Sequence, residues 1–223
     1  MNTERRIKMN KNLTEMIFIM DRSGSMQNLV SDTIGGYNSM IDKQRGEEGE
    51  AAVTTVLFDD EYDILFENTD IKKVPELTNK EYFARGMTAL LDAIGKTINQ
   101  VSARHKTMVD SAVPAKTVVV IITDGMENAS KEYKLQTVKA MIEKQKKEFG
   151  WEFVFMGANI DAISVAGSMG IDASRAANYH ADSVGTATNF VAVGKMFTSV
   201  RKGNSVADNW KEEIDKDYNS RKK

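Results

Sequence analysis

Two continuous apolar runs, each ending at an aspartate, constrain this chain more than any other feature of its sequence. The first run, Met16–Met20, ends at Asp21, and the second, Thr117–Ile122, ends in Thr123-Asp124-Gly125. An apolar run that is short and does not alternate with polar residues is typical of a strand buried on both faces, as in a parallel sheet. Both aspartates are therefore expected at the C-terminal ends of buried strands.

Weaker patterns place further elements around these runs. They predict helices over residues 26–45, 125 to about 149, 160–169 and 186–201, and one more helix that begins within residues 86–90 and ends at about 101. They also predict strands over residues 51–58, 62–66, 152–156 and 178–180. The link Asp59-Asp60-Glu61 is too short for a parallel crossover and predicts an antiparallel hairpin at one edge of the sheet. The alternation predicts a doubly wound, mostly parallel α/β sheet of about six strands with helices on both faces, a Rossmann-like arrangement.

The composition excludes several classes of protein. A hydrophobic content of 41% and a charged content of 28% in 223 residues are typical of a folded globular domain. The net charge of −2 argues against a nucleic-acid or anionic-membrane partner, and no segment approaches the ~20 apolar residues of a membrane span. Cysteine is absent, which excludes disulfides and thiolate metal sites and favours a reducing, cytoplasmic location.

The chain divides into one domain with two polar ends. Residues 1–12 are expected to form a flexible basic leader rather than a signal peptide, because Glu15 interrupts the apolar character that follows and no small-residue cleavage site comes after it. Residues 13–203 carry the predicted strands and helices. Residues 204–223 are expected to form a charged C-terminal tail with Trp210 as its large apolar anchor.

Polar side chains begin where the first apolar run stops. Asp21, Ser23 and Ser25 would point the same way if the chain stayed extended, because side chains alternate along an extended chain. A carboxylate with two hydroxyls offers only oxygen ligands, which hard divalent cations such as Mg²⁺ prefer. The same residue types also cap helices and form turns, so the pentapeptide by itself leaves both readings open. An EF-hand loop fits poorly, because Met26 stands where that loop needs glycine.

Taken together, three segments resemble the von Willebrand factor type A domain and its metal-ion-dependent adhesion site, or MIDAS. Asp21, Ser23 and Ser25 match the family's D-x-S-x-S motif, the stretch 86–93 resembles its glycine-x-threonine loop and supplies Thr88, and Thr123-Asp124-Gly125 matches its later T-D-G and supplies Asp124. The resemblance covers residues ~13 to ~203 and implies a metal site of five residues: Asp21, Ser23, Ser25, Thr88 and Asp124.

The resemblance also implies a function. Members of the family hold a divalent cation, here expected to be Mg²⁺ or Mn²⁺ in preference to Ca²⁺, and a partner protein completes its coordination with an Asp or Glu carboxylate. The chain is similar to stand-alone cytoplasmic members from bacteria and phages, which often accompany ATPases or stress-response proteins. Such a module is expected to bind protein without being an enzyme. Asn128, close to Asp124 in sequence, is a candidate for orienting the ligands.

Two other functions remain open at this point. A metal-dependent hydrolase could use the same cluster, but Ser23 or Ser25 as a nucleophile would need a general base, and the two histidines, His105 and His180, lie far from the motifs in sequence. A structural domain with a vestigial site is the third possibility, and the intact set of five residues argues against it.

Overall fold

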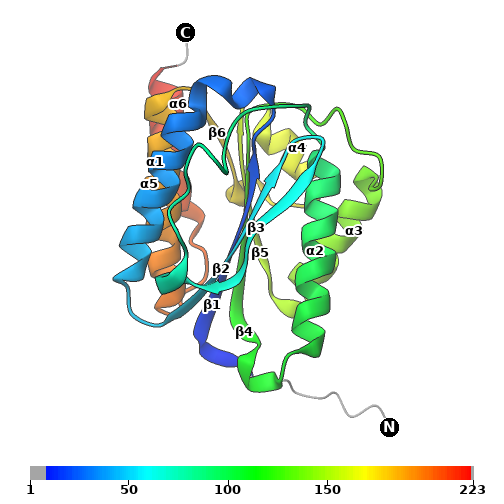
Figure 1. Cartoon of the computed structure of the whole chain (residues 1–223), viewed down its shortest axis with the longest axis vertical. Helices are drawn as coiled ribbons and strands as arrows, with labels where there is room; N and C mark the ends of the chain where they lie inside the picture. Colours follow the sequence, from blue (N-terminus) through cyan, green and yellow to red (C-terminus); the bar gives the residue numbers. More distant parts are fainter. Residues whose placement is uncertain (1–8, 222–223) are drawn as a thin grey trace.

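A single six-stranded sheet divides the structure, a computed structural model that describes residues 9–221 (Figure 1). The strand order is β3-β2-β1-β4-β5-β6; neighbouring strands run parallel except for β2 and β3, which pair antiparallel at one edge. The strands are β1 (Asn10–Asp21), β2 (Glu50–Phe58), β3 (Tyr62–Asp70), β4 (Pro114–Thr123), β5 (Glu152–Ala158) and β6 (Ala176–Tyr179). The predicted doubly wound, mostly parallel sheet with an antiparallel edge hairpin is confirmed.

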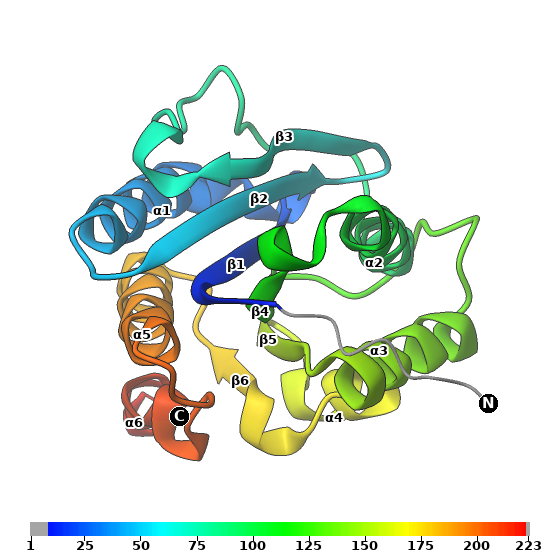
Figure 2. The same ribbon diagram turned by 90° about the horizontal axis from the view of Figure 1, so that it is seen from below.

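Helices cover both faces of this sheet, as the view from below shows (Figure 2). On one face lie α1 (Val30–Arg45), α5 (Ser183–Arg201) and α6 (Glu212–Ser220). On the other face lie α2 (Leu90–Thr107), α3 (Leu135–Phe149) and α4 (Ala162–Ser168). Within residues 9–221, no helix is both long enough and apolar enough to cross a membrane.

Strand β1 shows why its apolar run does not alternate with polar residues. Met16, Phe18 and Met20 pack in the core formed with α1 and α5, whereas Ile17 and Ile19 pack in the core formed with α2 and α3. All five are at most 1% exposed. A strand covered on both faces must be apolar at every position, which is the physical reason that the run predicted a central strand.

The first strand begins earlier than predicted. Residues 1–8 of the predicted leader lie outside the described residues, but Asn10 already starts β1 and pairs with Pro114 of β4. Glu15, which bounds the apolar run in the sequence, is fully buried inside the strand. Its carboxylate pairs with Arg104 and contacts His105 Nε2 at 2.6 Å, so α2 supplies the partners that keep a buried charge stable there.

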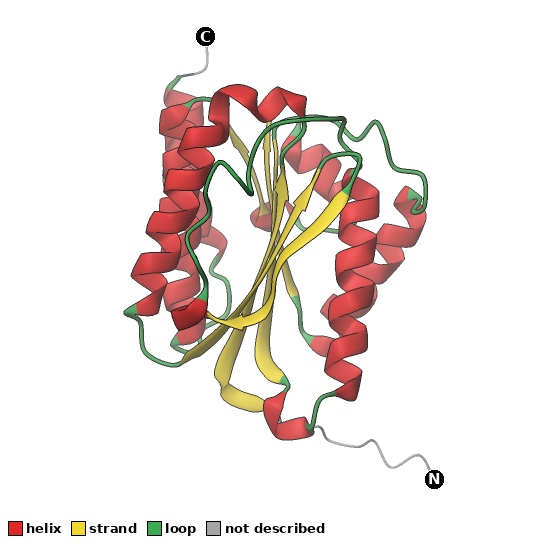
Figure 3. Ribbon diagram, in the orientation of Figure 1, coloured by secondary structure: helices red, strands yellow, loops and turns green. Residues whose placement is uncertain are grey.

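The helix after β4 begins later than predicted, at Leu135 instead of directly after Gly125. Residues 126–134 form a loop, because three consecutive backbone N–H groups, those of residues 131–133, donate to the carboxylate of Asp92 on α2 at 2.8–3.0 Å. These three N–H groups are satisfied by a side chain, so the segment does not need helical hydrogen bonds to satisfy them. Figure 3 shows this loop at the upper end of the sheet.

Two glycines near the middle of α1 have different surroundings. A Cβ on Gly36 would lie 2.3 Å from Cδ2 of Phe190, so Gly36 allows α5 to approach α1 closely. A Cβ on Gly35 would meet nothing within 4 Å. The glycine pair therefore permits contact between two helices, and only one member of the pair is needed for it.

The segment after residue 203 contains a helix that the sequence pattern did not predict. Helix α6 packs against α5 and β6, and the apolar contacts come from Val206, Trp210 and Ile214, each at most 8% exposed. Arg221 pairs with Asp182 just before α5 and with Asp217 of α6. The charged residues that suggest a tail occupy the outer face of a short helix.

Candidate metal site

The candidate site lies at the C-terminal ends of β1 and β4, the two neighbouring strands in the middle of the sheet. The chain leaves β1 toward β2 on one side, and β4 continues toward β5 on the other, so the sheet order reverses direction between these two strands. Ligand sites of doubly wound sheets occur at such switch points. Asp21 ends β1, and Asp124 follows the last residue of β4.

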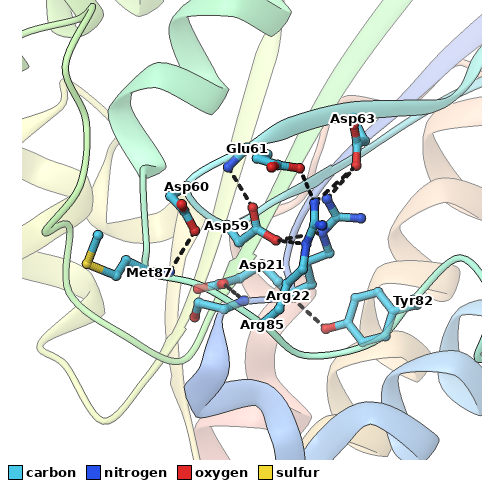
Figure 4. A network of polar contacts seen from close by, with 10 residues as sticks. Asp21, Arg22, Asp59, Asp60, Glu61, Asp63, Tyr82, Arg85 and Met87 are labelled. Atoms are coloured by element: carbon cyan, nitrogen blue, oxygen red, sulfur yellow. Dashed lines mark hydrogen bonds and ion pairs between the residues drawn. The ribbon is translucent and has the colours of Figure 1, made fainter.

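Asp21 is held by its own loop and by the neighbouring strand. One carboxylate oxygen, Oδ1, accepts a hydrogen bond from the backbone N–H of Ser23 at 2.7 Å, and Oδ2 accepts one from the hydroxyl of Thr123 at 2.5 Å. Beneath it, the buried hydroxyl of Tyr82 donates to the backbone carbonyl of Asp21 at 2.5 Å (Figure 4). Asp21 has no exposed surface and therefore a fixed orientation.

The serines reach the site by a turn instead of by an extended chain. A 3-10 helix over Gly24–Leu29 follows at once, and the N–H of Met26 donates to the carbonyl of Ser23 at 2.9 Å. This turn leaves the hydroxyl oxygens of Ser23 and Ser25 3.1 Å apart. The side chains do converge, but the extended-chain reason given for it is wrong.

The helix-capping reading of these serines is also wrong. Ser23 precedes the 3-10 helix but makes no side-chain cap hydrogen bond, and α1 begins only at Val30, whose cap position is Leu29. The hydroxyls of Ser23 and Ser25 are directed to each other and toward Asp124 instead.

Asp124 and Thr88 close the other side of the cluster. The hydroxyl of Ser25 donates to Oδ1 of Asp124 at 2.5 Å. A Cβ built on Gly125 would lie 3.5 Å from the hydroxyl oxygens of both Ser25 and Thr88. Gly125 thus leaves open a small space that Ser25 and Thr88 both face, and the three predicted segments meet around it.

Thr88 is positioned by Asn128, which sequence reasoning associated with the ligands in general. The side-chain amide oxygen of Asn128 accepts the backbone N–H of Thr88 at 2.9 Å, and the backbone N–H of Asn128 donates to the carbonyl of Thr88 at 3.0 Å. This two-way contact fixes the threonine backbone between its loop and the loop that carries Asp124. Thr123 and Tyr82, which hold Asp21, were not identified from the sequence as orienting residues; Tyr82 lies in an irregular segment with no local signal.

The two carboxylates are in an environment that disfavours their negative charge. Burial raises the pKa of Asp21 to about 6; hydrogen bonds from Thr123 and Ser23 oppose this shift, and the nearby charge of Asp124 adds to it. Burial also raises the pKa of Asp124, against the hydrogen bond from Ser25. Within residues 9–221, neither carboxylate forms an ion pair with a lysine, arginine or histidine. A bound cation would supply the missing positive charge.

The histidines are engaged elsewhere. His105 contacts Glu15 and packs edge-on against Trp151, with ring centroids 5.5 Å apart. His180 contacts the carbonyl of Tyr218 at 3.1 Å. In the part of the chain that the structure describes, the serine hydroxyls contact each other and Asp124, and neither contacts a histidine.

The donor set fits a hard divalent cation. Among the described residues, no three His, Cys, Asp or Glu side chains gather as a metal-binding group. The candidate site combines two carboxylates with three hydroxyls, and a set made only of oxygens suits Mg²⁺ or Mn²⁺, which also retain waters.

Solved structures share this fold at low sequence identity. The vWF domain of the type V pili tip protein Mfa5 from Porphyromonas gingivalis has a TM-score of 0.61 at 11% identity, over 87% of this chain and 98% of that chain. Manganese-loaded TRAP protein from Plasmodium vivax has a TM-score of 0.54 at 14% identity, over 82% of this chain and 74% of that chain.

Proximal thread matrix protein 1 from the mussel byssus, solved with a zinc-occupied MIDAS motif, has a TM-score of 0.58 at 17% identity, over 85% of this chain. The match spans 47% of that protein, about half its length. A comparison with curated protein sequences finds no significant match. A family model described as the von Willebrand factor type A domain matches residues 15–194, and the chain belongs to this family.

Proposed function

We propose that this chain is a metal-dependent protein-binding module in which five residues hold one divalent cation. These residues are Asp21, Ser23, Ser25, Thr88 and Asp124. The observation that carries the proposal is the pair of buried carboxylates, Asp21 and Asp124, set among hydroxyls without a positively charged partner in the described part of the chain. A bound cation supplies a Lewis-acidic centre on which an external carboxylate can act as a ligand.

The chain's own residues have separate tasks in this proposal. Asp21 and Asp124 provide the negative charge, and the hydroxyls of Ser23, Ser25 and Thr88 provide neutral oxygens. Two carboxylates and three hydroxyls supply five oxygens if each binds once, so an octahedral cation would keep at least one position for water or an external ligand. A partner Asp or Glu completes the set of ligands. Its attraction to the cation offsets the free-energy cost of removing its carboxylate from water.

Mg²⁺ or Mn²⁺ is the proposed cation, in preference to Ca²⁺. Small hard cations accept few carboxylates with waters and external ligands, and Ca²⁺ takes more oxygens in a looser arrangement. The manganese-loaded state of the Plasmodium vivax relative and the zinc-occupied MIDAS of the mussel protein support a divalent cation in this fold.

The proposed partner is a protein of the cytoplasm, such as an ATPase or a stress-response protein. The absence of cysteine supports a reducing compartment, and the net charge of −2 offers no general attraction for nucleic acid. Protein binding is preferred to hydrolysis, because neither Ser23 nor Ser25 contacts a histidine that could act as a general base. A vestigial site would not bind metal, so calorimetry tests that alternative directly.

Two linked experiments test the proposal. Calorimetric titration of the metal-free chain with Mg²⁺ and with Mn²⁺ should show one site, and the Asp21→Asn variant should show none. In a pull-down from the source cell's lysate, partner retention should be lost in EDTA, return with Mg²⁺, and be absent for Asp21→Asn. Retention that is the same in EDTA and Mg²⁺ would show that another surface binds the partner. The surface variant Glu148→Gln, at the far end of α3, is the control for loss of one negative charge.

A further inference from the structure

The loop of the β2–β3 hairpin contributes none of the five candidate ligands, yet it contacts both neighbouring ligand loops (Figure 4). Its first residue, Asp59, is fully buried. One carboxylate oxygen, Oδ2, accepts hydrogen bonds from Nε of Arg22 at 3.0 Å and from Nε of Arg85 at 2.7 Å. The other, Oδ1, accepts the N–H of Glu61 at 2.6 Å. Arg22 and Arg85 come from different ligand loops and meet on one carboxylate.

The same hairpin holds the backbone on both sides of Thr88. The carbonyl of Asp59 accepts the N–H of Ala89 at 2.9 Å. The side chain of its neighbour Asp60 accepts the N–H of Met87 at 3.1 Å. Thr88 therefore has a fixed residue before it and after it, and both of the fixing groups belong to the hairpin loop.

Direct contacts between the two ligand loops complete the arrangement. The N–H of Arg85 donates to the carbonyl of Arg22 at 2.8 Å, and the N–H of Gly24 donates to the carbonyl of Gly86 at 3.1 Å. Gly86 has a φ of +66°, and a Cβ there would lie 1.9 Å from Oδ1 of Asp60. The loop that carries Thr88 can take this path only with glycine at 86.

The buried carboxylate of Asp59 holds two guanidinium groups in fixed positions. Removing its charge leaves Arg22, which is 3% exposed, with the half-exposed Asp63 in place of a buried partner, and the loss of a buried partner from a buried charge is strongly disfavoured. Charge-assisted bonds to arginine are also short and directional. The Asp59 side chain thereby ties the loop that carries Ser23 and Ser25 to the loop that carries Thr88.

We infer that Asp59 is a positioning residue, which sets the separation between the hydroxyls of Ser23 and Ser25 and the hydroxyl of Thr88 and so sets the affinity of the site for its cation. This inference rests on the proposed function. Residues that orient ligands from outside the coordination shell typically change metal affinity by about 10- to 100-fold when they are replaced. Nothing in the sequence pattern marks Asp59, which lies in a three-residue hairpin link.

The test compares Asp59→Asn with Asp63→Asn by calorimetric titration with Mg²⁺, well below the melting temperature of each variant. Asp63 also pairs with Arg22 and lies 3.6 Å from the guanidinium of Arg85, but its side chain is 54% exposed whereas that of Asp59 is fully buried, so water can replace its contacts. Asp59→Asn should bind Mg²⁺ at least about fivefold more weakly than wild type, with Asp63→Asn close to wild type. Amide exchange at Ala89 should also be faster in Asp59→Asn.

If the role of Asp59 is purely structural, Asp59→Asn will have a lower melting temperature and an unchanged dissociation constant for Mg²⁺. That result overturns the inference. An equal loss of Mg²⁺ affinity in Asp63→Asn also overturns it. If Asp59→Asn does not fold, the Arg85→Gln variant decides, because Arg85 is 37% exposed and its loss removes the bond from Asp59 to the loop of Thr88 while Arg22 stays paired with Asp59. Weaker Mg²⁺ binding by Arg85→Gln then supports the inference, and wild-type binding overturns it. If the wild-type chain itself binds no Mg²⁺, the proposed function fails and the inference falls with it.

Discussion

Replacing Asp21 with asparagine should stabilise the metal-free protein while destroying its metal site. Asparagine keeps the size of the side chain and can still accept the N–H of Ser23. Its NH₂ group can donate to the hydroxyl oxygen of Thr123, which also exchanges hydrogen bonds with Gly125 at 3.2 Å and can reverse its direction. The substitution therefore removes a buried charge without removing the contacts around it.

The expected gain in the free energy of unfolding follows from the pKa of Asp21. Burial raises it from 3.8 to about 6, a shift of about two units, and each unit corresponds to 1.36 kcal/mol. Protonation of Asp21 in the folded state contributes stability that is fully present below pH 3.8 and is lost as the pH rises through about 6. Above that pH the wild type carries the full cost of the buried charge, so Asp21→Asn should be more stable by up to about 3 kcal/mol in EDTA.

Urea unfolding of wild type and Asp21→Asn in EDTA, at about pH 8 and about pH 4, measures this difference. The gap should be close to its maximum at the higher pH and should nearly vanish at the lower one. With Mg²⁺ at about 100 times its dissociation constant, wild type should gain about 2.7 kcal/mol and the variant nothing. Glu148→Gln should change none of these values. An Asp21→Asn variant that is less stable than wild type in EDTA at both pH values would refute the reasoning.

Three further predictions concern other parts of the chain. Mg²⁺ affinity should be constant above about pH 7 and fall as the pH drops through about 6, because a proton on Asp21 competes with the cation; calorimetry at several pH values checks this. Thr123→Val should lower the urea-derived stability by about 1–3 kcal/mol, because Asp21 loses a buried hydrogen-bond donor, and Thr123→Ser should largely restore it. Gly36→Ala should destabilise the protein by about 1–3 kcal/mol, because the added Cβ overlaps Phe190. Gly35→Ala, whose Cβ has open space around it, should stabilise the protein by up to about 1 kcal/mol. The reverse order of stabilities would contradict the packing described.

The central strands and the ligand types could be read from the sequence, because both depend on local pattern. A strand covered on two faces has to be apolar throughout, so Met16–Met20 and Thr117–Ile122 marked β1 and β4. Parallel strands need long crossovers, and the short link at Asp59–Glu61 therefore identified the antiparallel edge. The resemblance to a known family then brought together Thr88 and Asp124, which no local rule could place beside Ser25.

Features that depend on partners distant in the chain were decided only by the tertiary structure. The late start of α3 depends on Asp92, about 40 residues before the loop that it holds. The buried Glu15 depends on Arg104 and His105, and the helix after residue 203 depends on surfaces offered by α5 and β6.

The same limit applies to the candidate site. The sequence by itself determined which oxygens are available and at which end of the sheet they lie, since apolar periodicity and strand direction are properties of short segments. It did not determine that Ser23 reaches the site by a turn, that Asn128 holds Thr88, or that Asp59 joins two loops. Those contacts exist only after the sheet has aligned the ends of β1, β2 and β4, because a hydrogen bond between distant segments has no local signature in either of them.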